Sequence, residues 1–199
     1  MTPHPVQFQA APSRMSRVHV GVRLAAIVVL SSVACSSGYW LLYLAVPAFA
    51  ALLIARDGPE GYLERDAPAS IRVLQWLADA YAYLWLLTDA VPSAQVRPAP
   101  RLTIELGGKP TVGAALWRLV TSLPALLLLI VVSIVAAVLW IVGAISILAT
   151  ERVPSAITDF VAMKLRYQFR LVAYHLSLVD VYPVVADAPQ PHAPPTGTA

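Results

Sequence analysis

A tyrosine and an aspartate recur at the same spacing in the two halves of the chain. The pattern Ala-Tyr-x5-Asp-x2-Pro occurs twice, with Tyr83 and Asp89 in the first half and Tyr174 and Asp180 in the second. A carboxylate at a membrane surface can bind a proton or a cation, or it can contact a partner protein. An aspartate three residues before a proline can instead belong to a turn, in which it accepts hydrogen bonds from backbone N–H groups. All four are candidate functional residues, and a turn is the interpretation that we favour for the aspartates.

The other reactive side chains do not form a catalytic or metal-binding pattern. Cys35 is the only cysteine, which excludes an intramolecular disulfide, and the four histidines are scattered without ligand spacing. His175 is the only histidine near a candidate carboxylate, and no Ser-His-Asp pattern accompanies it. We therefore expect no enzymatic activity, no cofactor, no metal ion and no nucleic-acid partner.

Two long apolar runs must position these residues. Residues 24–55 and 119–150 contain no Asp, Glu, Lys, Arg or His, and each run directly follows an arginine. Uncharged apolar runs of more than 18 residues are typical of membrane segments. The chain is 58% hydrophobic and 13% charged, whereas soluble domains carry about 25% charged residues. The sequence therefore predicts an integral membrane protein.

The length of the runs leaves three arrangements open in the bilayer. As one helix, either run is roughly 48 Å long, which exceeds the roughly 30 Å hydrocarbon core. A run can form one tilted helix, a hairpin of two short helices or a re-entrant wedge. Basic residues flank both runs, and such segments normally face the cytoplasm. Hairpins keep all charges on that side, so we favour hairpins in a multi-pass protein of the bacterial inner membrane.

The same order of elements appears twice. Each half has a short alternating strand, an apolar run, a turn, an amphipathic helix and the Tyr/Asp motif. We predict an all-α membrane protein built as a tandem repeat, with a short β-strand before each apolar segment. The expected units are repeat 1 at 1–93, a linker at 94–100, repeat 2 at 101–184 and a disordered Pro-rich tail at 185–199.

The helix that follows each run is expected to lie in the membrane interface. Over residues 161–180 apolar side chains recur every three or four positions, which is typical of an amphipathic helix. Lys164 and Arg166 flank this apolar face and Arg170 lies beyond Arg166, so these three are the candidate contacts to lipid headgroups, with anionic lipids as expected partners. In the alternative, these helices cap a helical bundle and their aromatic residues only pack.

The second half resembles a bacterial membrane family called domain of unknown function 4389. The similar segments are RLTIEL at 101–106, RLVTSLP at 118–124, ILATERVPSAITDF at 147–160 and RLVAYHLSLVDVYP at 170–183. The first half resembles the family more weakly, because Asp57-Gly58-Pro59 replaces the usual turn. The resemblance, about 180 residues in two tandem copies, implies a membrane location and no known activity.

These features favour a non-enzymatic membrane-embedded scaffold or interaction protein. The alternative is a small transporter or channel component acting as an oligomer, since internal repeats are common in transporters. The apolar runs contain few polar residues, which weakens that alternative. The expected partners are the bilayer itself and either a second copy of the chain or another membrane protein.

Overall fold

The computed structural model describes residues 4–8, 15–37, 39–91 and 101–185, without the side chains of 30–44. This part of the chain is mostly helical. The order is β1 (Val6–Phe8), α1 (Arg17–Ser37), α2 (Tyr39–Gly61), the short π-helical segment η1 (Tyr62–Asp66), α3 (Ala67–Leu84), β2 (Leu102–Ile104), α4 (Val112–Thr121), α5 (Leu123–Thr150) and α6 (Ser155–His175). The expected linker and the expected tail, apart from Val185, lie outside the described residues.

The two apolar runs fold differently. The first is divided between α1 and α2, and the predicted turn after it is confirmed by Gly58, which is non-helical at φ 73°. The second forms the single 28-residue helix α5, so the expected hairpin is wrong there. Pro124 does not bend α5, because it lies in the first turn, where a helix needs no N–H donor.

The predicted strands are confirmed as a two-stranded antiparallel sheet. β1 pairs with β2 so that Val6 faces Ile104, Gln7 faces Thr103 and Phe8 faces Leu102. Val6, Phe8 and Leu102 are buried, because the sheet covers one side of the helical core. The sheet therefore ties the segment before the first apolar run to the segment before the second.

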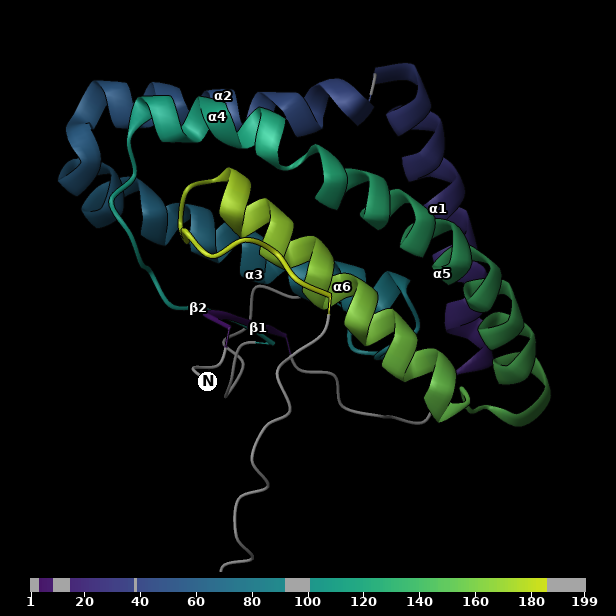
Figure 1. Ribbon diagram of the computed structural model, residues 1–199. Coiled ribbons are helices and arrows are strands. Elements are labelled where there is room, and N and C mark those ends of the chain that lie inside the picture. Colours follow the sequence, from purple (N-terminus) through teal and green to yellow (C-terminus); the bar gives the residue numbers. More distant parts are fainter. Residues whose placement is uncertain (1–3, 9–14, 38, 92–100, 186–199) are drawn as a thin grey trace, which may run out of the picture.

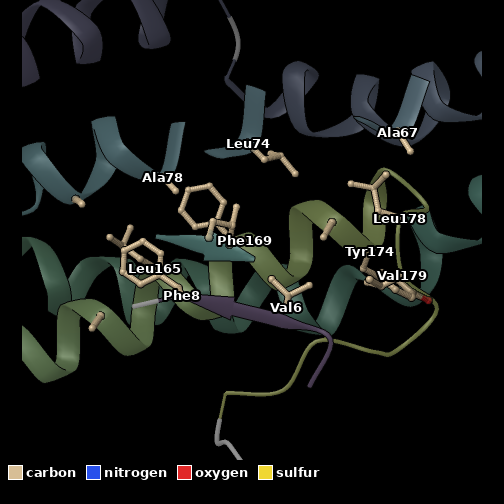
Figure 2. Packing of buried hydrophobic residues seen from close by; sticks show 14 of the residues in the cluster. Val6, Phe8, Ala67, Leu74, Ala78, Leu165, Phe169, Tyr174, Leu178 and Val179 are labelled. Carbon is tan, nitrogen blue, oxygen red and sulfur yellow. The ribbon is translucent and has the colours of Figure 1, made fainter. Parts of the chain in front are cut away.

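Helix α6 runs through the centre of the molecule, between α5 and the sheet (Figure 1). Figure 2 shows its inner residues Leu165 and Phe169 among side chains from α3 and β1. The ring of Phe169 stacks on Phe8 at 6.0 Å and meets the edge of Tyr81 at 6.1 Å. The expectation that this helix lies in the membrane interface is wrong, because neighbouring elements cover nearly all of its length.

The helices of the apolar runs, α1, α2 and α5, lie on the outside of the molecule, together with α4, which leads into the second run. In Figure 1, α2 and α4 lie side by side along the top, and α1 and α5 descend on the right. Helix α5 buries one face against α6 and exposes large apolar side chains on the other. It is the one helix among the described residues that is long and apolar enough to cross a membrane.

Candidate functional site: two arginine–tyrosine–aspartate clusters

The Tyr/Asp motif forms the same turn at the end of α3 and at the end of α6. Leu86 and Ser177 have positive φ angles of 61° and 56°. The N–H of Leu87 donates to the carbonyl of Ala82 at 2.9 Å, and in the second half Leu178 donates to Ala173 at 3.1 Å. This is the Schellman arrangement, which satisfies the last carbonyls of a helix. Both turns place the aspartate three residues after the left-handed residue.

In the first half, this turn surrounds a buried arginine from α1. The Nη2 atom of Arg23 donates to the Oδ1 atom of Asp89 at 2.6 Å and to the carbonyl of Thr88 at 2.7 Å. The guanidinium also lies 4.6 Å from the ring centroid of Tyr83, within cation–π distance. The charge of Arg23, whose side chain is completely buried, is thus balanced inside the protein.

In the second half, Arg118 of α4 takes the same place. Its Nη1 atom donates to the carbonyls of Tyr174 at 2.6 Å and Val179 at 2.8 Å. Its Nη2 atom donates to Asp180, and its guanidinium lies 4.5 Å from the ring centroid of Tyr174. In both halves, therefore, the arginine binds the aspartate, the carbonyl just before it and the face of the motif tyrosine.

The surroundings of the two clusters differ. Asp89 also accepts a hydrogen bond from the backbone N–H of Ser16 at 2.5 Å, and the Nδ1 atom of His19 lies 3.9 Å from it. In the second cluster, a Cβ atom on Gly108 would lie 1.7 Å from the Oδ2 atom of Asp180. The side chain of Asp180 is 48% exposed, compared with 22% for Asp89.

These contacts make each cluster a joint between helices. Each carboxylate lies on a turn and is bound to an arginine, so the turn interpretation describes its position better than a free cation site does. We did not predict Arg23 and Arg118, although each lies at or next to the start of an apolar run. Their position could have indicated this role, because an arginine at the start of an apolar run needs a charged or polar partner when it is buried.

The predicted headgroup contacts lie mainly inside the protein. Lys164 and Arg170 are buried, so the prediction that they contact lipid headgroups is wrong. The Nζ atom of Lys164 donates to Gln168 at 2.6 Å and lies 4.2 Å from the ring centroid of Trp85, and burial lowers its pKa to about 7. Arg170 donates to the carbonyls of Val6 and Val184 at 3.3 and 2.9 Å. Arg166 is partly exposed, and its contact to lipid stays a prediction.

Within the described residues, no group of three or more His, Cys, Asp or Glu side chains could hold a metal ion. Burial lowers the pKa of His175 to about 4, so this ring is neutral at physiological pH.

Comparison with known proteins identifies one family match. Residues 113–186 match the model of the family described as "Domain of unknown function (DUF4389)". This segment runs from α4 to the end of the second cluster and contains Arg118, Tyr174 and Asp180. The match supports the resemblance that we noted for the second half. No curated protein and no solved structure matches the chain.

Proposed function

We propose that this chain is a non-enzymatic scaffold or interaction protein, embedded in the membrane through the outer faces of α1, α2, α4 and α5. The observation that carries the proposal is an apolar stripe on α5. Its members follow one another every three or four residues, and each is more than half exposed: Leu127, Val131, Ile134, Val138, Ile141 and Ile145. Soluble proteins rarely expose apolar patches of this extent, whereas lipid chains would cover the stripe at no cost.

We also propose that the two halves are copies of one unit, related by a pseudo-two-fold axis. The two clusters support this, because in both an arginine binds the aspartate, the carbonyl before it and the ring of the motif tyrosine. The sheet supports it as well. Gln7 and Thr103 are the middle residues of the two strands, and they face each other across the antiparallel pair. An axis between them would exchange β1 with β2 and α3 with α6.

In the proposed orientation, this axis lies along the membrane normal and all polar ends of the apolar runs face the same side. Two contacts support it. The start of the first run meets the end of the second, since the N–H of Met15 donates to the carbonyl of Glu151 and Arg17 pairs with Glu151, both at 3.2 Å. The end of the first run, on α2, packs against α4 at the start of the second. Helix α5 has 28 residues and is about 42 Å long, so both of its ends reach this side only when the helix lies at a low angle to the membrane plane.

The basic residues near these ends make the cytoplasm the favoured side, because positively charged segments remain there during insertion. The resemblance to a bacterial family makes the bacterial inner membrane the proposed location. In Figure 1 the sheet lies on the other side of α6 from α2 and α4, and its exposed residues, such as Thr103, would be available to a partner. A binding surface on this side is what a scaffold needs.

Extraction and reconstitution of the full chain test the proposal. The wild-type protein is expected to stay in the membrane fraction after alkaline carbonate extraction. Leu127→Lys combined with Ile134→Lys should reduce that fraction, because two charges would face lipid. Thr103→Lys, at a residue of the sheet whose side chain is exposed, is the matched control and should have no effect.

Reconstituted vesicles should also keep an entrapped dye and an ion gradient. Extraction of the wild-type protein by carbonate would contradict membrane embedding. Flux of a solute through the vesicles would instead support the transporter alternative.

A further inference from the structure

Helix α3 carries an exposed stripe that combines apolar and basic side chains. Ala69, Arg72, Val73 and Trp76 recur at intervals of three and four residues, and all four are exposed. We call them the α3 stripe. The opposite face of α3 is buried against the core through Leu74, Ala78 and Ala82. The α3 stripe is thus the outer face of an otherwise packed helix.

The second half covers the corresponding face with an apolar helix. Counted from the motif tyrosines, Trp76 corresponds to Tyr167 of α6. Trp76 is 55% exposed and Tyr167 is 1% exposed. The hydroxyl of Tyr167 donates to the carbonyl of Ala125 on α5 at 3.0 Å, and its ring packs with Leu129. In the second half, α5 covers the face of α6 that corresponds to the α3 stripe, whereas the α3 stripe itself is exposed.

From this placement we infer that the α3 stripe contacts the headgroup region of the bilayer, with Trp76 at the boundary between headgroups and lipid chains. The inference rests on the proposed membrane embedding. It keeps for α3 the interface position that we predicted for the helix after each run, whereas the corresponding helix α6 is buried.

The residue types of the α3 stripe suit this position. Tryptophan is enriched at membrane interfaces because its ring is apolar and its N–H is polar. Arginine can lay its aliphatic part on apolar surface and extend its guanidinium to a phosphate. Helix α3 also follows α2, one of the proposed membrane-facing helices, through η1, and Leu52 of α2 is 65% exposed.

Net charge contributes little to this contact. The segment before α3 exposes Glu60 and Glu64 as well as Arg65, so basic and acidic groups nearly balance. We therefore expect the α3 stripe to bind zwitterionic membranes as well as anionic ones.

Depth-dependent quenching in vesicles tests the inference. In the full chain carrying Cys35→Ser, Val73→Cys is labelled with an environment-sensitive fluorophore and reconstituted into phosphatidylcholine vesicles, with and without phosphatidylglycerol. Val131→Cys on α5 and Thr103→Cys on the sheet are the controls for deep and aqueous positions. The label at position 73 should lose more fluorescence to a headgroup nitroxide than to a mid-chain nitroxide. Position 131 should show the reverse, and position 103 should respond only to iodide.

Each other result overturns the inference in a distinguishable way. Quenching of position 73 by iodide alone, with lipid quenching at 131, would leave membrane embedding intact and place the α3 stripe in water. Protection of position 73 from every quencher would mean that a protein, such as a second copy, covers the α3 stripe. Iodide quenching at position 131 would overturn the membrane proposal itself.

A second variant tests the role of the tryptophan. Adding Trp76→Ala to Val73→Cys should reduce the loss of fluorescence to the headgroup nitroxide, whereas Glu64→Gln should not change it. An unchanged signal with Trp76→Ala would contradict the anchoring role of Trp76.

Discussion

Arg23 and Arg118 show how single residues join helices α1 and α4 to the core. A buried guanidinium is costly unless its charge is paired and its N–H groups are bonded. Here an aspartate supplies the charge, a backbone carbonyl accepts a hydrogen bond and a tyrosine ring covers the face of the group. These contacts require the turn after α3 or α6 to lie at the start of an apolar run. The two clusters thereby attach the start of each run to the core.

The second cluster depends on a glycine. Gly108 has φ 95°, and a Cβ atom there would overlap the carboxylate of Asp180. Gly108→Ala should therefore lower the free energy of unfolding by about 1–2 kcal/mol from the backbone alone, and by more as Asp180 is displaced from Arg118. Denaturant unfolding in detergent measures the loss.

Gly107→Ala is the matched control, because no atom lies within 4 Å of a Cβ atom at that position. Equal stability of the two variants would show that Asp180 does not need the space beside Gly108.

Lys164 makes stability depend on pH. Burial lowers its pKa from 10.5 to about 7. Below pH 7 the amine is charged in both the folded and the unfolded state, so the full cost of burying the charge is present. Between pH 7 and 10.5 only the unfolded state holds the proton. The free energy of unfolding should therefore rise with pH, by at most about 1.4 kcal/mol per pH unit.

Lys164→Met should flatten this rise between pH 7 and 9, as measured by denaturant unfolding at a series of pH values. Lys109→Met, at an exposed lysine, should leave the rise unchanged. An equally steep rise in Lys164→Met would assign the pH dependence to another group.

At the scale of single elements, the two apolar runs show how similar composition can give different helices. The first run has Ser36-Ser37-Gly38 near its middle, and its helix is divided between Ser37 and Tyr39. The second has only Ser133 near its centre, and α5 continues through it. Glycine and serine weaken a helix relative to the aliphatic residues that fill the second run. The one-helix and two-helix arrangements therefore occur in the same molecule.

The start of α4 is set by a capping residue. The Oγ1 atom of Thr111 accepts a hydrogen bond from the N–H of Ala114 at 3.2 Å. Thr111→Ala should lower the free energy of unfolding by about 1 kcal/mol, because this N–H loses its partner. Thr111→Ser retains the hydroxyl and should stay near the wild type. Thermal unfolding of both variants measures the difference, and equal melting temperatures would contradict the capping role.

At the scale of the whole molecule, the proposed two-fold arrangement predicts one topology. In the Cys35→Ser chain, single cysteines replace the exposed residues Glu60, Glu105 and Asp159. Intact cells are then treated with an impermeant thiol reagent. All three positions should remain unlabelled until the cells are lysed, because the proposed arrangement puts all polar ends of the apolar runs on the cytoplasmic side. Labelling of position 60 or 105 from outside would mean that a run crosses the membrane once.

The sequence by itself determined the properties that depend on local composition and spacing. The uncharged run at 119–150 predicted a long apolar helix, the alternation at 101–106 predicted β2, and Gly58 and the Tyr/Asp motif predicted turns. Helical periodicity correctly predicted that α6 has an apolar face. These features are readable because each residue acts on its own neighbours along the chain.

Only the tertiary structure decided which faces are covered. The basic side chains of α6 suggested lipid contact, yet Lys164 and Arg170 are buried. Lys164 donates to Gln168 and lies over the ring of Trp85. Arg170 donates to backbone carbonyls of segments far away in the sequence. The pairing of Arg23 with Asp89 likewise joins residues from separate elements. Such contacts depend on packing between elements that local patterns do not encode. The sequence pattern of a charged residue on an amphipathic helix is the same whether its side chain contacts water, a lipid headgroup or a buried partner.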